Sequence, residues 1–123
     1  RFAYNGAEPS IPETIVNFED RFGKWGFRKN VVSPVYGLAE CSVGLAFTTP
    51  GQAWRMDVLD RDTFSTTGGA LGADPQDPSP LKILGCGHVI PGHDMRVVDG
   101  AGIELPDRQE GMLEFRGPSA TTG

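Results

Sequence analysis

The chain has 123 residues and a formal net charge of −5, which suits one modest domain with its own core. It has no basic patch that would hold a phosphate backbone, which excludes nucleic-acid binding, and no apolar run long enough to span a membrane. Its 17 glycines and 10 prolines indicate many turns, or a piece of a larger protein.

The N-terminal residues predict a strand followed by a helix. Residues 2–5 have the pattern of the end of a buried strand, stopped by Gly6. Ser10 is expected to cap the helix, with Pro12 in the first turn and Glu13 at the capping-box spacing. Apolar side chains then recur at helical spacing and predict one face packed in the core, made of Ile15, Phe18, Phe22 and Trp25.

The middle of the chain predicts short strands and then a loop. Residues 30–38, "NVVSPVYGL", favour a buried strand, and residues 42–50, "SVGLAFTTP", a second one. Residues 53–64 mix a strand with a short helix capped near Asp60. Residues 65–80, "STTGGALGADPQDPSP", contain few large apolar side chains and predict a mobile surface loop. Both a linker between subdomains and an inserted functional segment fit this loop.

The last third changes to a period of two, which indicates antiparallel strands. "LKILGCG", "DMRVVD" and "GMLEFRG" are the predicted strands, and Asp99-Gly100 is a turn signal between two of them. The fold class is therefore mixed: a strand–helix–strand piece of an α/β sheet, followed by a small antiparallel, barrel-like β subdomain. We divide the chain into residues 1–50 (α/β part), 51–81 (flexible insertion) and 82–123 (β part).

The reactive side chains outside the turns suggest no site of their own. Cys41 and Cys86 are too few for a disulfide framework and lack metal-site spacing, so we interpret them as thiols of a cytoplasmic protein. His88 and His93 are interpreted as ordinary loop histidines. The chain starts within a predicted strand at residues 1–4 and stops in a turn-rich stretch, from which we expect a piece of a longer protein.

Two polar turns carry the chemistry of the sequence. "NGAEP", Asn5 to Pro9, and "YGLAE", Tyr36 to Glu40, each follow a predicted strand. If the two strands are parallel neighbours, both turns lie at the sheet edge where open α/β sheets bind ligands. An aromatic face for a base and a carboxylate for Mg²⁺ then suggest a purine nucleotide with magnesium, although plain turn chemistry also explains these residues.

These motifs resemble those of the adenylate-forming (AMP-binding) superfamily. "NGAEP", "FGKWGFRKNVVSPVYGLAE" and "CGHVIPGHDMRVVDGAGIELPDRQEGMLEFRGPSATTG" follow the order seen in that superfamily and cover nearly the whole chain. The combination of the two turns, with the long segment after the second, is most similar to fatty acyl-AMP ligases and acyl-CoA synthetases. The resemblance implies a fragment of the large N-terminal domain of such an enzyme.

The resemblance also implies a role for each turn residue. Adenine binding would fall to Gly6, Ala7, Glu8 and Tyr36, and the wall of the acyl-adenylate pocket to Gly37, Leu38 and Ala39. Glu40 would bind Mg²⁺. Ala39 stands where most relatives have a threonine that contacts the α-phosphate, and alanine is usual in the fatty acyl-AMP ligase branch. The insertion of that branch is implied to disfavour coenzyme A as acceptor.

The implied enzyme uses ATP and Mg²⁺ to activate a fatty acid as acyl-AMP, releasing pyrophosphate, for transfer to an acyl carrier protein. A coenzyme A ligase and a non-catalytic module that binds adenylates or a protein are the alternatives. The phosphate loop, the ribose-binding aspartate and the catalytic lysine of the superfamily are not among these 123 residues. We therefore predict that the fragment alone is inactive, and that its uncovered apolar surface favours self-association.

Overall fold

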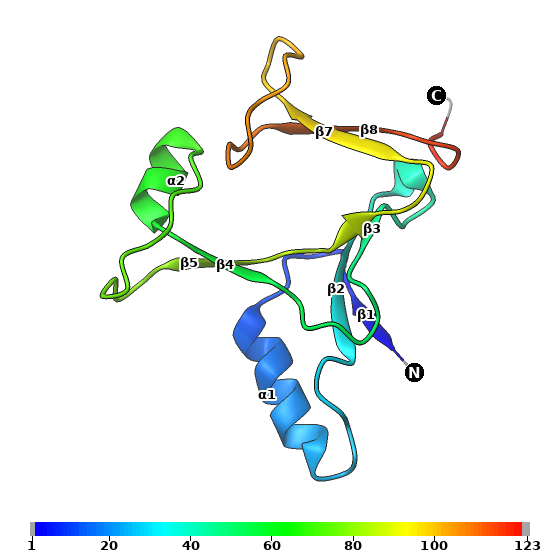
Figure 1. The fold of residues 1–123 in the computed structure, drawn as a ribbon, viewed down its shortest axis with the longest axis vertical. Coiled ribbons are helices and arrows are strands. Elements are labelled where there is room, and N and C mark those ends of the chain that lie inside the picture. Colours follow the sequence, from blue (N-terminus) through cyan, green and yellow to red (C-terminus); the bar gives the residue numbers. More distant parts are fainter. Residues whose placement is uncertain (1, 122–123) are drawn as a thin grey trace.

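The computed structural model describes residues 2–121, which form three separate sheets and two helices (Figure 1). A four-stranded sheet has the order β1-β2-β3-β6, and the remaining strands form the hairpins β4–β5 and β7–β8. The strands are β1 (Ala3–Asn5), β2 (Val32–Tyr36), β3 (Ala46–Phe47), β4 (Met56–Leu59), β5 (Leu81–Leu84), β6 (His88–Val89), β7 (Asp94–Val98) and β8 (Met112–Arg116). The two α-helices are α1 (Pro12–Gly23) and α2 (Arg61–Thr67), and η1 (Ala39–Cys41) is a single 3-10 turn.

The predicted strand–helix–strand unit is confirmed. Strands β1 and β2 pair in parallel, with Ala3 opposite Val32 and Asn5 opposite Pro34. Helix α1 makes the crossover that a parallel pair requires. Strand β2 is buried at its centre as expected, whereas β1 is not a buried strand: it is the edge of the sheet, and Tyr4 is 55% exposed.

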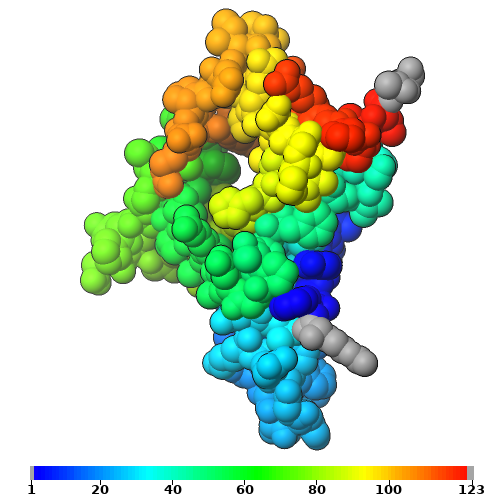
Figure 2. Space-filling view, turned by 45° about the vertical axis from the view of Figure 1, so that its right-hand side comes forward, coloured from blue at the N-terminus to red at the C-terminus, as the bar shows by residue number. Residues whose placement is uncertain are grey.

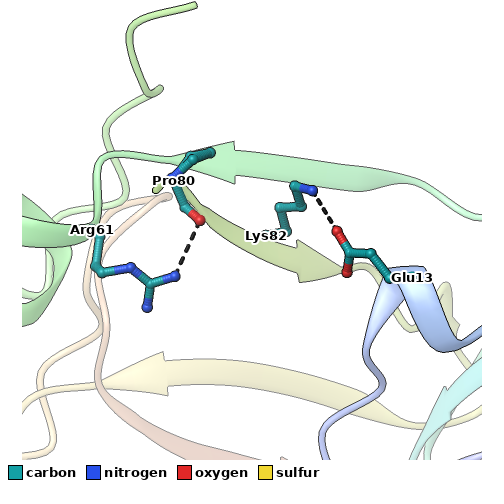
Figure 3. A network of polar contacts seen from close by, with 4 residues as sticks. All are labelled: Glu13, Arg61, Pro80 and Lys82. Atoms are coloured by element: carbon teal, nitrogen blue, oxygen red, sulfur yellow. Dashed lines mark hydrogen bonds and ion pairs between the residues drawn. The ribbon is translucent and has the colours of Figure 1, made fainter. Parts of the chain in front are cut away.

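Helix α1 does not begin with the predicted cap. Ile11 occupies the N-cap position without a side-chain hydrogen bond, and Pro12 is the first helical residue, so Ser10 is not the cap. Glu13 is therefore free of a capping role, and its carboxylate accepts a hydrogen bond from Lys82 on β5 (Figure 3). This ion pair holds the start of α1 to the β4–β5 hairpin.

Only part of the apolar face of α1 is packed in a core. Ile15 is 2% exposed, but Phe18, Phe22 and Trp25 are 45%, 37% and 67% exposed. The prediction of core packing was therefore wrong for the aromatic rings, because no other part of residues 2–121 covers them. The rings pack on one another instead, with the centroids of Phe18 and Phe22 4.6 Å apart.

The second predicted strand is much shorter than expected. Of residues 42–50 only Ala46 and Phe47 form β3, and they pair antiparallel with the end of β2. Ser42 and Val43 have positive φ angles of 54° and 79°, which no strand accommodates. The predicted short helix is confirmed as α2, whose cap Asp60 accepts a hydrogen bond from the Thr63 amide at 2.7 Å.

The segment predicted as a loop is held at both ends. Its first residues, 65–67, complete α2, which corrects the prediction of a loop there. Further along, the Ala70 amide donates to the Arg108 carbonyl at 2.8 Å. Arg61 donates to the carbonyls of Ser79 and Pro80 at 3.0 and 3.1 Å, which fixes the end of the loop to the start of α2 (Figure 3). Its mobility stays a prediction.

The antiparallel pairing of the last third is confirmed, but its strands do not close into a barrel. Strand β5 pairs with β4 and β6 pairs with β3, so only β7 and β8 pair with each other. The Asp99 turn is confirmed, and its carboxylate accepts from the amides of Ala101 and Ile103. The β3–β6 pairing joins residues 1–50 to residues 82–123, and the division into three segments stays a prediction.

The buried core is small, and its members include residues of all three sheets and of α1. Its apolar members are Ile15, Cys41, Leu45, Ala46, Leu59, Leu84 and Val98. Leu45 donates its amide to the Tyr36 carbonyl at 3.0 Å, so this part of the core lies directly behind the end of β2. Within residues 2–121, no helix combines the length and the apolar character needed to cross a bilayer. Thr122 and Gly123, at the end of the predicted turn after β8, and Arg1, in the predicted first strand, lie outside the described residues.

Candidate functional site

The two polar turns lie at the same edge of the sheet. Asn5, the last residue of β1, pairs with Pro34, and the parallel strand β2 ends two residues later at Tyr36. A Cβ atom on Gly6 would lie 2.9 Å from Cγ2 and 3.0 Å from the carbonyl oxygen of Val35, so glycine lets the first turn approach β2 closely. Ala7 follows with a φ of 70°. The side chains of Ala7 and Glu8 are both exposed. The structure therefore brings the turn residues together as predicted.

Tyr36 is the last residue of β2 and faces an open cavity. Its side chain is 40% exposed, and the cavity that it lines has a volume of about 480 Å³. The wall continues on other elements with Phe64, Cys86, Met95 and Leu113. Figure 2 shows the molecule opened between its green and yellow parts. An aromatic ring that is accessible beside a cavity can accept a planar group on its face.

Gly37 turns the chain sharply after β2. A Cβ atom at this position would lie 1.6 Å from the Val43 carbonyl oxygen, a distance that no side chain can accommodate. The Leu38 carbonyl then accepts the amides of Cys41 and Val43 at 3.1 and 3.0 Å. These bonds fold residues 37–43 into a compact turn directly after Tyr36.

Glu40 stands in η1 with an exposed carboxylate, next to the exposed Ala39. Among residues 2–121 the carboxylate has no ion-pair partner, and no three metal-binding side chains lie close together. Magnesium is commonly held by one or two carboxylates, with water and substrate phosphates as its other ligands. A single exposed carboxylate, with no ion-pair partner among residues 2–121, fits this kind of magnesium site and does not fit a metal held by protein ligands alone.

The two cysteines are free thiols in different surroundings. Cys41, the last residue of η1, is buried, and its Sγ donates to the Leu38 carbonyl at 3.2 Å. Cys86 is half-buried in the cavity wall, and burial raises the pKa of its thiol. His88 is exposed and lies in strand β6, which corrects the prediction of a loop at this position.

Sequence reasoning missed the residues that support η1 from the other end of the chain. The Thr121 amide donates to the Glu40 carbonyl at 2.8 Å, and the Ser119 hydroxyl lies 3.1 Å from the Cys41 carbonyl. His93 was predicted to be an ordinary loop residue, yet its Nε2 lies 2.7 Å from Ser119 Oγ. Ser119 and Cys41 are 78 residues apart in the sequence, so no local sequence pattern predicts this contact.

This fold is that of adenylate-forming enzymes. The family described as AMP-binding enzyme matches residues 1–123, and the chain belongs to that family. It is 30% identical over 120 residues to the long-chain-fatty-acid–AMP ligase FadD32 of Mycolicibacterium smegmatis, covering 97% of this chain and 19% of the relative. It is 32% identical over 121 residues to the long-chain-fatty-acid–AMP ligase FadD28 of Mycobacterium tuberculosis, covering 97% and 20%.

A solved structure has the same arrangement. The fatty acyl-adenylate ligase from Legionella pneumophila, in complex with acyl adenylate and pyrophosphate, superposes with a TM-score of 0.89 at 30% identity. The match covers 99% of this chain and 21% of that structure. The chain therefore spans about a fifth of the length of the proteins it resembles.

Proposed function

We propose that the intact protein, meaning residues 1–123 with whatever sequence adjoins them in their gene, activates a fatty acid as acyl-AMP. The observation that carries this proposal is the meeting of the two turns at the ends of parallel strands, beside an open cavity. The names of the relatives support the substrate class: FadD32 and FadD28 are called long-chain-fatty-acid–AMP ligases.

In this proposal the adenine of ATP lies against the ring of Tyr36. The exposed ring offers a face for the base, and the turn at Gly6, Ala7 and Glu8 borders the same sheet edge. Stacking of a base on an aromatic ring contributes about 1–3 kcal/mol. The wall beside the acyl-adenylate would be formed by Gly37, Leu38 and Ala39. At Gly37 the close approach of the Val43 carbonyl leaves no room for a side chain.

The reaction forms a mixed anhydride between a fatty-acid carboxylate and AMP. A carboxylate oxygen attacks the α-phosphorus, the bond to the bridging oxygen of pyrophosphate breaks, and pyrophosphate leaves. Catalysis of this kind rests on positioning and charge stabilisation and needs no protein nucleophile. Glu40 would hold a magnesium ion, which supplies positive charge at the phosphates. Tyr36 and the two turns bind and orient the nucleotide.

The acceptor in this proposal is the thiol of an acyl carrier protein, and the protein acts in the cytoplasm, where ATP is available and thiols remain reduced. Coenzyme A is the alternative acceptor. Incubating the intact protein with ATP, a fatty acid and either thiol distinguishes the two. Predominant formation of acyl-CoA would rule out the carrier-protein assignment, and a product on the carrier alone would support it.

The activation step is tested by fatty-acid-dependent release of pyrophosphate. We expect Tyr36→Ala to raise the KM for ATP by about tenfold, from the loss of stacking, and Tyr36→Phe to stay near wild type. We expect Glu40→Gln to lower kcat/KM by about 100-fold, as for loss of one group that stabilises transition-state charge. Glu104→Gln, which removes an equally exposed carboxylate from the β7–β8 connection, is the control. Unchanged kinetics in Tyr36→Ala and Glu40→Gln would refute the proposal.

A further inference from the structure

The short helix that carries Glu40 does not hold its own shape. Helix η1 is a single turn of three residues, and Leu38, at its N-cap, makes no side-chain capping bond. The next two residues, Ser42 and Val43, have left-handed φ angles of 54° and 79°. A non-glycine residue in this region costs about 1–3 kcal/mol and persists only where its surroundings impose it. The surroundings of η1 therefore fix the direction of Glu40.

The loop after β8 supplies part of that support. On one side of the turn the Thr121 amide donates to the Glu40 carbonyl at 2.8 Å. The Ser119 hydroxyl lies 3.1 Å from the Cys41 carbonyl, and the Ser42 hydroxyl lies 3.5 Å from the Ser119 carbonyl. In Figure 1 this loop, in red, lies beside the turquoise turn of η1. These bonds join Glu40, Cys41 and Ser42 to the loop after β8. Cys41 and Ser119 are 78 residues apart in the sequence.

His93 holds Ser119 in place. Its Nε2 lies 2.7 Å from Ser119 Oγ and 3.3 Å from the Ser119 amide, and its Nδ1 lies 3.3 Å from the Pro91 carbonyl. The ring also fills the space above Gly117, where a Cβ atom would lie 2.1 Å from Cδ2 of His93. His93 is therefore fixed by packing as well as by its two ring nitrogens.

The hydrogen atoms can be assigned from the partners. The Ser119 hydroxyl has one hydrogen and donates it to the Cys41 carbonyl, so it accepts from Nε2 of His93, which carries a hydrogen in this arrangement. The atom that matters for Ser119 is therefore the one at the Nε2 position. A glutamine places its amide group, which can also donate, close to this position, whereas alanine leaves the Ser119 hydroxyl without this donor.

We propose that His93 and Ser119 are positioning residues that orient Glu40 toward the bound nucleotide and its magnesium ion; this inference rests on the proposed function. Neither side chain contacts the substrate in this proposal. They act through the Cys41 carbonyl and so through the turn that bears the carboxylate. Loss of a group that orients a metal ligand weakens metal binding by about 10- to 100-fold.

The test compares four single variants and one double variant of the intact protein with the wild type. His93→Ala and Ser119→Ala are expected to raise the KM for MgATP about tenfold, with kcat at saturation changed less than about threefold. His93→Gln is expected to stay close to wild type. His88→Ala, which removes the chain's other histidine from an exposed position, is the matched control. Because the two side chains act in one chain of contacts, the double variant His93→Ala/Ser119→Ala is expected to match the worse single variant.

Amide hydrogen exchange of residues 36–43 gives a readout that needs no turnover. We expect faster exchange in this segment in His93→Ala and Ser119→Ala, and unchanged exchange in His93→Gln and His88→Ala. Unchanged exchange and KM in His93→Ala and Ser119→Ala would overturn the inference, as would a loss in His93→Gln equal to that in His93→Ala. A wild-type protein that releases no pyrophosphate with any fatty acid would refute the proposed function instead, and exchange would still decide whether His93 and Ser119 hold the segment.

Discussion

Replacing Gly37 by alanine is expected to disrupt the turn between β2 and η1. The added Cβ atom would lie 1.6 Å from the Val43 carbonyl oxygen, while ordinary contact begins at 3.4 Å, so the two backbone segments would have to separate by about 1.8 Å. Val43 lies in a left-handed conformation, and its amide donates a hydrogen bond to the Leu38 carbonyl at 3.0 Å. The turn therefore has little freedom to absorb the movement.

The cost follows from two losses. Forcing extra atoms into a packed site costs about 1–3 kcal/mol, and occasionally more. Loss of the bond between Val43 and Leu38 adds about 1 kcal/mol. We therefore expect Gly37→Ala to lower the free energy of unfolding by about 2–4 kcal/mol. Gly100→Ala is the matched control, because a Cβ atom at Gly100 meets nothing within 4 Å, and its effect should stay below about 1 kcal/mol.

Urea denaturation of the intact protein, followed by circular dichroism, measures the stability of both variants. The KM for MgATP, measured under folding conditions, reports whether the turn that bears Glu40 has moved. The steric reasoning predicts a lower midpoint and a raised KM for Gly37→Ala alone. If Gly37→Ala unfolded at the same urea concentration as Gly100→Ala, the close approach of residues 37 and 43 would be refuted.

Two further predictions concern buried groups. Thr48→Val should lower the free energy of unfolding in urea by about 1–2 kcal/mol, because the buried Thr48 hydroxyl donates to the Pro34 carbonyl at 2.8 Å. Thr49→Val, at an exposed neighbouring position, should leave the free energy of unfolding unchanged. Equal effects of the two substitutions would contradict the role of this hydrogen bond. Because burial raises the pKa of Cys86, its alkylation, mapped by mass spectrometry, should reach half of its maximal rate at a higher pH than that of a free cysteine. The stabilising effect of the neutral thiol is complete below the pKa of the unfolded chain and is lost as the pH rises through the raised pKa of the folded protein. A midpoint at or below that of free cysteine would contradict this.

The sequence allowed correct prediction of those features that depend on neighbouring residues. The parallel unit β1–α1–β2 follows from two apolar runs and a helical period between them, and the cap of α2 follows from Asp60 before the helix. The glycines after each strand marked the turns correctly, and the structure shows the reason at Gly6 and Gly37, where the backbone approaches too closely for a side chain.

The failures depend on partners that a local pattern does not contain. Ser10 has the chemistry of a cap, yet Ile11 takes the position and Glu13 pairs with Lys82 across the fold. Alternation predicted strands β5, β7 and β8, but not that β5 pairs with β4, nor that His88 and Val89 form β6 beside β3. The spacing of the aromatic residues in α1 predicted the helix correctly. It did not predict that their rings would be exposed, because a helical period contains no information on what covers the apolar face.

The candidate site combines both kinds of information, and this determines how it can be altered. The residues proposed to face a ligand, such as Tyr36 and Glu40, lie within one short stretch of the sequence and were proposed from it. Their orientation depends on the left-handed Val43 and on Ser119 and Thr121 after β8. Substitutions in the loop after β8 should therefore affect nucleotide binding without touching the nucleotide. Identical turn sequences placed on a scaffold without that loop should bind it more weakly, because the strained turn would then relax.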